Sequence, residues 1–494
     1  MSTTPTPVIL SLRGRLSFLL KDSILYGGAA ALSKAFALIT FPLLARHFSV
    51  AEYGVLDYFL ALASLGAIFF VFGQDSAVAR YFYEYESIED RRQLISQSLV
   101  FQLFGLTLFV PVLWFSAGWL TQILIAATDR VLLFKIILAQ LPFLLIINFS
   151  QNLLKWTFAR SRFLTMSLGF TGVHAALLVV AVLYFDASIA GVLWVGFATS
   201  VVFAALGLFF VRGWLARPKD FQRLREMLPF ALPYGVICLA GAFSPTLERT
   251  LINSLLGAEA MGLYAAATKM AMLIALLVSA FQTAWGPFSL SLHKQADAAR
   301  TFNWVLKLFV VGICLAVLFI TLLSQPLIHF LATDRYASAA IVVFPLVMGL
   351  AIQATSWITE IGIGLSKRSY LSLFAYSVAI LVTLIGIWLL TPLFGLLGVG
   401  LGVLLGHMAK AFVASWLAQR AHPLPWHYGP VVLVLFVTLM GGLVATWLQV
   451  EHGSFPANTA IIMSMLSVLG VGWLAVLNKN DRQRVLALFP MKQG

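Results

Sequence analysis

The chain alternates about fourteen apolar stretches, each about 17 to 25 residues long, with short polar connections along nearly its whole length. An apolar helix of that length spans the hydrocarbon core of a bilayer, which is about 30 Å thick. Of the 494 residues, 61% are hydrophobic and only 10% are charged, which is more apolar surface than a water-soluble domain can bury. The sequence therefore predicts an all-α polytopic membrane protein with no separate water-soluble catalytic domain.

The edges of the apolar stretches give the boundaries of the predicted transmembrane helices. We predict about 14 spans, at residues 22–44, 56–79, 93–115, 131–150, 163–184, 189–211, 230–252, 263–291, 302–323, 340–362, 370–390, 396–418, 429–448 and 457–477.

Lys and Arg are concentrated in alternate connections between these spans. One set of connections holds most of them, whereas the other holds little beyond Arg46, Arg130 and Arg335. Because Lys and Arg accumulate in cytoplasmic loops, we expect both termini in the cytoplasm and an even number of spans. The net charge of +13 is spread over loops in this way, so it does not indicate a nucleic-acid partner.

A weak internal repeat appears at an offset of about 208 residues. The matched residues fall at equivalent points of the two hairpins that open the six-helix blocks. The matches are Tyr26-Gly27 with Tyr234-Gly235, Gly54 with Gly262, Gln74 with Gln282, and Arg92 with Arg300. Two blocks of six helices share one membrane orientation, as in transporters whose substrate site lies between parallel repeats. We therefore predict two six-helix bundles in parallel repeat plus a C-terminal helix hairpin.

This organisation divides the chain into five parts. They are a cytoplasmic N-terminal segment (1–21), an N-terminal bundle (22–211), a basic cytoplasmic linker (212–229), a C-terminal bundle (230–420), and spans 13 and 14 with a cytoplasmic tail (421–494). The first 21 residues lack a signal-peptide pattern. Cys238 and Cys314 fall inside predicted spans, so we expect neither a disulfide nor a metal site.

Several ionisable residues interrupt the apolar spans, namely Lys34, Asp57, Asp75, Glu248, Arg249, Lys269, Glu360 and Lys410. Each costs about 2.5 to 3.5 kcal/mol at lipid depth, so each should face a partner or a watery cavity. Lys34, Arg249 and Lys269 lie in spans 1, 7 and 8 and would offer cations to one shared space. Such a cavity suits an anionic group such as phosphate or pyrophosphate.

Structural roles are the alternative for these residues. Arg249 and Glu248 are neighbours that either reach the interface or form a structural pair. Asp75 and Glu360 are either ion- or proton-coupling sites or polar contacts between helices.

Two segments resemble the opening hairpins of oligosaccharide-lipid flippases. The first runs from Pro42 to Gly54 (PLLARHFSVAEYG) and is followed by Gly73 and by Ala79-Arg80-Tyr81, and the second runs from Leu255 to Tyr264 (LLGAEAMGLY). With the span count and the repeat, the chain is similar to the polysaccharide transporter family of the multidrug/oligosaccharidyl-lipid/polysaccharide exporter superfamily over essentially its whole length.

The resemblance implies a flippase rather than an enzyme. The expected cargo is an undecaprenyl-pyrophosphate-linked oligosaccharide, which crosses the bacterial inner membrane by alternating access through a cationic central cavity, for O-antigen, capsule or exopolysaccharide synthesis. The expected partners are the lipid-linked oligosaccharide, membrane lipids and other polysaccharide assembly proteins, and the expected state is a monomer. No catalytic residue, metal or cofactor is expected.

The resemblance also completes the predicted site. Lys34, Lys269 and Asp57 look like counterparts of two cations and an acid in related flippases, whereas the middle of span 2 is apolar and Arg80 lies nearer its cytoplasmic end. We assign the cavity to Lys34, Arg249, Lys269, Asp57, Arg80, Gln74 and Gln282. We assign coupling to an ion gradient, as in an antiporter, to Asp75, Glu248 and Glu360.

Three rival functions remain at the level of sequence. A drug or cation exporter of the same superfamily needs more acids than bases in its cavity. A membrane glycan polymerase or ligase needs a catalytic outward loop, and here the longest such connections hold only Asp129, Arg130, Asp334 and Arg335. A scaffolding role in a polysaccharide assembly complex leaves no sequence signal.

Overall fold

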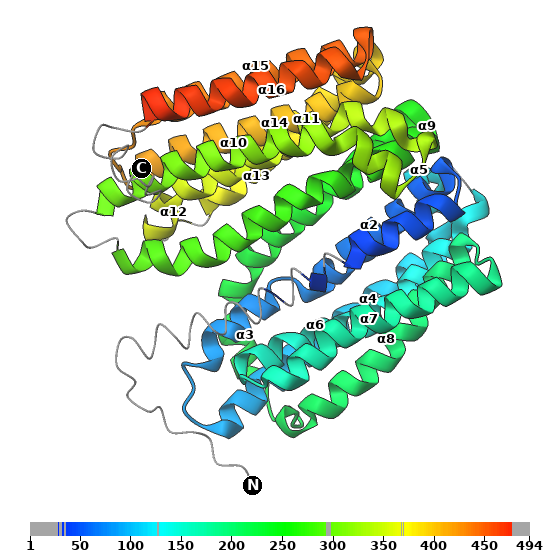
Figure 1. Cartoon of the computed structure of the whole chain (residues 1–494). Coiled ribbons are helices and arrows are strands. Elements are labelled where there is room, and N and C mark those ends of the chain that lie inside the picture. Colours follow the sequence, from blue (N-terminus) through cyan, green and yellow to red (C-terminus); the bar gives the residue numbers. More distant parts are fainter. Residues whose placement is uncertain are drawn as a thin grey trace, which may run out of the picture.

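The computed structural model describes residues 28, 32–33, 36–125, 128–292, 298–366, 368 and 370–476. Lys34, the repeat pair Tyr26-Gly27, the predicted N-terminal segment and the tail after residue 476 lie outside the described residues. The described part of the chain is built from helices and their connections, without β-strands, so the predicted all-α class is confirmed (Figure 1).

The first half of the chain, up to residue 211, forms one group of helices. In order these are the helix Phe36–His47, α2 (Val50–Val71), α3 (Gln74–Phe82), α4 (Ile88–Phe115), α5 (Ala117–Ile125), α6 (Val131–Trp156), α7 (Arg160–Phe185) and α8 (Ile189–Val211). Short 3-10 turns, Thr128–Arg130 and Arg212–Trp214, precede α6 and follow α8.

The second half begins with α9 (Gln222–Leu292). It continues with α10 (Ala298–Leu331), a 3-10 turn (Asp334–Ala339), α11 (Ala340–Thr359), α12 (Ile361–Ser366), α13 (Tyr370–Phe394) and α14 (Leu396–Ala421). The hairpin of α15 (Tyr428–His452) and α16 (Ser454–Val471) follows, and α16 is extended by a π-helical turn (Gly472–Val476).

Twelve helices of the described residues are long and apolar enough to cross a bilayer. One of them, α9, has 71 residues, which is too long for a single crossing, and its helical path is interrupted at Gly257 (φ 83°, ψ 180°). Gly257 lies between the predicted spans 230–252 and 263–291, so α9 contains both. The helix Phe36–His47 is the described part of the first predicted span. The described helices thus account for thirteen of the fourteen predicted spans and for part of the first.

The second predicted span, 56–79, was wrong as a single helix. The structure begins α2 at Val50, where Ser49 and Glu52 form a capping box, and breaks the span at Phe72 and Gly73. Both break residues have left-handed backbone angles, with φ of 42° and 73°. At Gly73 a side chain could not fit, because its Cβ would lie 2.5 Å from the backbone nitrogen of Gly235 in α9. Contact with the other half of the chain therefore accompanies the break.

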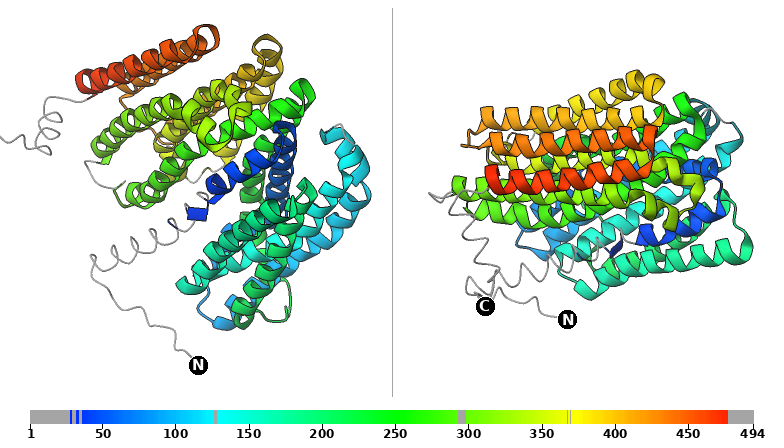
Figure 2. Two further views of the ribbon diagram at one scale, coloured as in Figure 1. Left: turned by 45° about the vertical axis from the view of Figure 1, so that its right-hand side comes forward. Right: turned by 45° about the horizontal axis from the view of Figure 1, so that its top comes forward.

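The two halves form two bundles that lie side by side (Figure 1). In that view the first half occupies the lower part of the molecule and the second half the upper part, with α9 running along the boundary. The hairpin α15–α16 packs on α10 and α11 and lies on the outer side of the second bundle in Figure 1 and in the left view of Figure 2.

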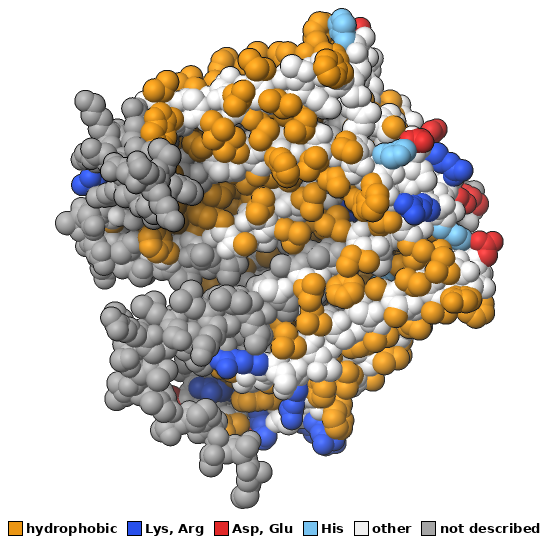
Figure 3. Space-filling model, in the orientation of Figure 1, with side chains coloured by type: hydrophobic (Ala, Val, Ile, Leu, Met, Phe, Trp, Pro, Cys, Tyr) orange, Lys and Arg blue, Asp and Glu red, His pale blue; other side chains and the backbone are white. Residues whose placement is uncertain are grey.

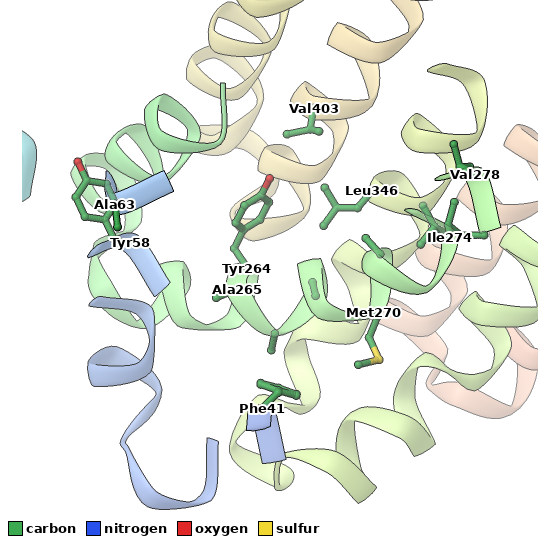
Figure 4. Packing of buried hydrophobic residues seen from close by; sticks show 14 of the residues in the cluster. Phe41, Tyr58, Ala63, Tyr264, Ala265, Met270, Ile274, Val278, Leu346 and Val403 are labelled. Atoms are coloured by element: carbon green, nitrogen blue, oxygen red, sulfur yellow. The ribbon is translucent and has the colours of Figure 1, made fainter. Parts of the chain in front are cut away.

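The bundles touch where α2 meets α9, around two glycines that the repeat had matched. A Cβ on Gly54 would lie 2.5 Å from the backbone nitrogen of Gly262, so the two backbones are nearly in contact. Beyond this point Tyr58 of α2 and Tyr264 of α9 are buried in the same apolar core, part of which appears in Figure 4. We call this end of the molecule the Gly257 end, and the opposite end, where residues 212–221 connect the two halves, the linker end.

The outer surface is consistent with a lipid environment. Hydrophobic side chains are spread over the described part of the face shown in Figure 3, while charged and histidine side chains gather toward its edges. On α7 and α13, for example, Leu183, Tyr184, Trp388 and Leu393 are more than half exposed. Such a surface is stable in hydrocarbon but not in water.

Candidate functional site

A cavity of about 770 Å³ lies between the bundles. Its walls come from α2, α3 and α6 of the first half and from both arms of α9 in the second half. The polar lining residues are Asp57, Ser64, Asp75, Asn148, Asn152, Cys238, Arg249 and Lys269. The volume is that of a typical small-molecule site, and the position is that of a transporter site between repeats.

Three charged side chains meet in this cavity near its Gly257 end. Asp57 accepts from Arg249 through Nε at 2.8 Å and Nη2 at 2.7 Å, both to Oδ2, and from Lys269 Nζ at 3.0 Å to Oδ1. The side chains are only 6%, 10% and 16% exposed, respectively. We call this group the charge triad. One carboxylate facing two cations leaves the triad with a net charge of about +1.

The local sequence explains how the triad assembles. Asp57 follows Gly54 by three residues, and Lys269 follows Gly262 by seven, so each charge lies on the same helix face as the glycine before it. Because the two glycines bring the backbones of α2 and α9 together, the charges on those faces must meet. The ion pairs therefore connect the first half of the chain to the second.

Glu248 has a different role from its neighbour Arg249. Its carboxylate accepts from the hydroxyls of Tyr264 at 2.7 Å and Ser244 at 2.8 Å, so it ties together the two arms of α9. It is buried and is not among the residues that line the cavity. Of the two alternatives that the sequence left open for Glu248, the structure shows a structural contact, with Tyr264 rather than Arg249 as the partner.

The other predicted residues are dispersed. Asp75 lines the cavity toward the linker end, and Gln74 is fully buried beside it in a separate small pocket. Arg80 is half exposed, pairs with Glu84 at 3.5 Å and stacks over Phe230 at 4.6 Å, so it lies outside the cavity. Gln282 is exposed and also outside the lining. Lys34 is outside the described residues.

A second buried charge cluster involves Glu360. Lys410 donates to Oε1 and Oε2 of Glu360 at 3.0 and 2.9 Å and to Ser356 at 3.1 Å. The Lys410 side chain is 1% exposed and that of Glu360 17%. Glu360 occupies the break between α11 and α12, whereas Lys410 lies on α14. This pair lies inside the second bundle and is separate from the charge triad.

The charge of the observed cavity lining differs from the charge that we predicted. Its described lining contains two acids and two bases, with the positive excess confined to the charge triad and Asp75 at the other end. The predicted general excess of cations is therefore not found in the described lining. Within the described ranges, no group of three or more His, Cys, Asp or Glu residues is placed to hold a metal ion.

Two residues of α6 that line the cavity, Asn148 and Asn152, were not among the predicted site residues. They lie four residues apart in a largely apolar helix, and both line the cavity. Such a pair was a detectable signal, because two carboxamides on one helix face are costly in lipid.

The fold and the site define a membrane protein of the two-bundle transporter class with a polar central cavity. The chain belongs to the polysaccharide biosynthesis protein family, whose model matches residues 19–293, so the predicted family is confirmed. A relative from Haemophilus influenzae, described as an uncharacterized membrane protein, is 25% identical over 285 residues, which are 56% of this chain and 67% of the relative.

Solved structures show the same fold. The lipid II flippase MurJ in an inward closed conformation is 14% identical, with a TM-score of 0.70 over 91% of this chain and 98% of MurJ. An inward-facing multidrug resistance MATE family transporter of the MOP superfamily is also 14% identical, with a TM-score of 0.64 over 78% of this chain and 94% of the transporter. These structures are a flippase and a transporter, not enzymes.

Proposed function

We propose that the protein is a flippase that moves an undecaprenyl-pyrophosphate-linked oligosaccharide from the cytoplasmic to the outer leaflet of a bacterial inner membrane. The products would serve O-antigen, capsule or exopolysaccharide synthesis. The observation that carries the proposal is the charge triad, which holds two cations in the cavity between the bundles. The family description and the fold shared with a lipid II flippase support it.

The triad would bind the pyrophosphate by exchange of anions. Arg249 presents a planar fork of donors and Lys269 a compact ammonium, which together suit phosphate oxygens. Asp57 occupies these donors in the structure. A pyrophosphate that replaces Asp57 as the partner of Arg249 and Lys269 removes the ion pairs between α2 and α9. Substrate binding therefore competes with contact between the bundles, which links occupancy of the site to their separation.

The cavity also provides a polar path for the sugar head group of the lipid-linked oligosaccharide. Each sugar hydroxyl is costly to transfer into hydrocarbon without a hydrogen-bond partner. From Asp57 to Val71 the α2 wall extends about 21 Å, which gives an elongated polar head group room beside the triad. The lipid tail would remain in the bilayer while the head group crosses.

Coupling to a proton or other cation gradient is the second part of the proposal. Of the three residues predicted for it, Glu360 has the most suitable surroundings, because its partly exposed carboxylate has a buried ammonium as its counter-ion. A proton on Glu360 would leave Lys410 charged without an anionic partner, which favours rearrangement at the α11–α12 break. Asp75 is open to the cavity, whereas Glu248 is fixed by two hydroxyls.

Depletion of the protein in its host tests the flippase proposal. Lipid-linked oligosaccharide should accumulate in the cytoplasmic leaflet, and an Arg249→Gln variant should not relieve the accumulation. Arg335→Gln, which removes an exposed arginine, should restore transport and serves as the matched control. Normal delivery to the outer leaflet with unpolymerised or untransferred units would instead indicate an enzyme and would overturn the proposal.

A further inference from the structure

A small pocket adjoins the central cavity where α3 meets α4 and α6. Its volume is about 10 Å³, close to the smallest space that admits one water molecule. Three residues, Val71, Asp75 and Asn152, line both this pocket and the cavity. The pocket is therefore a side recess of the cavity.

A hydrogen-bond relay fixes the orientation of Gln74 in this recess. Gln102 Nε2 donates to Ser98 Oγ at 3.1 Å, and Ser98 Oγ donates to Gln74 Oε1 at 3.1 Å. Because the oxygen of Gln74 is the acceptor, its Nε2 is left as a donor. This nitrogen is fully buried and has no hydrogen-bond partner among the described residues. A buried donor of this kind is rare in proteins, and an acceptor atom of a water molecule or a ligand would satisfy it.

Acceptors stand in the same recess. The carboxylate of Asp75 accepts only from its neighbour Ser76, through N at 2.8 Å and Oγ at 3.5 Å, so it retains free acceptor capacity within the described structure. The side chain of Asn152, which lines both the recess and the cavity, forms no hydrogen bond with another described residue. Trp156 adds an aromatic side chain to the wall.

The combination of donor and acceptor selects the chemistry of the partner. A bare cation could pair with the carboxylate of Asp75 but would leave the N–H of Gln74 without an acceptor, and a phosphate would be repelled by the carboxylate of Asp75. A hydroxyl satisfies both, because it accepts from Gln74 and donates to Asp75. The size of the recess also suits one hydroxyl in place of one water.

We propose that Gln74, Asp75 and Asn152 form a subsite that binds a sugar hydroxyl of the cargo, at the opposite end of the cavity from the charge triad. The inference rests on the proposed function, since it assigns the glycan end of the same substrate. The triad holds the anionic group, and this subsite distinguishes a lipid that carries sugar from one that does not.

Binding measurements on the purified full-length protein test the subsite. The probes are undecaprenyl pyrophosphate and the same lipid carrying one N-acetylglucosamine. The unsubstituted protein should bind the sugar-bearing lipid about fivefold more tightly, the effect of one net hydrogen bond. Gln74→Leu and Asn152→Leu should each abolish most of this preference and leave the affinity for the sugar-free lipid unchanged. Gln282→Leu, the repeat counterpart outside the cavity, should retain the preference.

The two proposals fail separately in this experiment. Retention of the full preference in Gln74→Leu and Asn152→Leu, or its absence in the unsubstituted protein, would overturn the subsite. An Arg249→Gln variant that binds the sugar-free lipid with unchanged affinity would overturn the pyrophosphate site instead. The side chain of Asn152 forms no hydrogen bond with a described residue, so its replacement tests the subsite even where Gln74→Leu disrupts the relay and impairs folding.

Discussion

Asp57 faces two cations of the opposite bundle, so its removal should destabilise the protein. An Asp57→Asn variant leaves Arg249 and Lys269 buried with no carboxylate between them, and we expect a loss on the order of 3 kcal/mol in the free energy of unfolding. Added inorganic pyrophosphate should raise the melting temperature of this variant more than that of the unsubstituted protein, because the anion replaces the missing carboxylate. Thermal unfolding in detergent measures both effects.

The double variant Asp57→Asn/Arg249→Gln provides the control for this prediction. It removes one charge of each sign, so it should recover part of the lost stability while responding less to pyrophosphate than Asp57→Asn. Equal responses of the unsubstituted protein and Asp57→Asn would show that the triad does not exchange its carboxylate for a phosphate.

The charged members of the site could be recognised from the sequence, but their pairing could not. Asp57, Arg249 and Lys269 are conspicuous because charges are costly in apolar spans. Which charges meet depends on the register of α2 against α9, which the near contact of Gly54 and Gly262 fixes. The repeat matched those glycines but also matched Gln74 with Gln282, and only the first of these is buried. A repeat in sequence does not impose equal surroundings on its copies.

Among the elements, the contact between α2 and α9 depends on the absence of a side chain at Gly262. A Cβ there would overlap the carbonyl oxygen of Val50, so Gly262→Ala should separate the two helices and lower both stability and transport. Gly172→Ala in α7 is the matched control, because its Cβ would meet no atom within 4 Å. The control should be neutral or stabilising by up to about 1 kcal/mol, since alanine favours the helix.

Comparing the melting temperatures and transport rates of the two alanine variants decides this point. If Gly262→Ala matched Gly172→Ala in both measurements, the close approach of α2 and α9 would not be needed for the function.

A second prediction at this scale concerns α11, α12 and α14. Glu360→Gln leaves the buried Lys410 without its anionic partner, so it should destabilise the second bundle, whereas Glu360→Gln/Lys410→Met should recover stability because no charge remains. If the pair couples transport to a gradient, the double variant should move substrate down its concentration gradient but no longer respond to an imposed pH difference. Transport in proteoliposomes with and without that difference measures the coupling. An unchanged response would exclude Glu360.

The helices themselves were largely predictable because the bilayer sets their length. Predicted span 189–211 coincides with α8, and most other spans differ from their helices by a few residues. The break at Gly73 was not predicted, although the polar Gln74, Asp75 and Ser76 follow it directly, and the structure places Gly73 against Ala231 and Gly235 of α9. Local hydropathy locates helices, whereas interruptions imposed by a distant helix require the tertiary structure.

At the scale of the whole molecule, the halves touch at both ends of the cavity. The Gly257 end has the contact of Gly54 with Gly262, and the linker end has that of Gly73 with Gly235. Also at the linker end, Arg223 pairs with Asp90 at 3.0 Å.

Tyr85 adds a further contact at the linker end, where its hydroxyl donates to Glu226 at 2.7 Å. Burial and the nearby carboxylate raise the pKa of Tyr85 to about 12, so it remains a donor at neutral pH. Alternating access would require these two sets of contacts, one at each end, to open in turn rather than together.

The native cysteines offer a test of the cavity as a whole. Cys238 is exposed and lines the cavity, whereas Cys314 is buried in the second bundle. N-ethylmaleimide should therefore modify Cys238 at least about tenfold faster than Cys314 in the folded protein, because the reagent needs an accessible thiol. Undecaprenyl pyrophosphate should slow the modification of Cys238 by occupying the space beside it.

Arg249→Gln separates protection by bound substrate from other effects of the lipid. In this variant Cys238 should react as fast as before, because the cavity stays open to the reagent, but undecaprenyl pyrophosphate should no longer protect it. Mass spectrometry of the labelled peptides measures both rates in one sample, with Cys314 as the internal reference. Protection that persists in Arg249→Gln would mean that the lipid covers Cys238 without binding the charge triad, and the anion site would then have to lie elsewhere between the bundles.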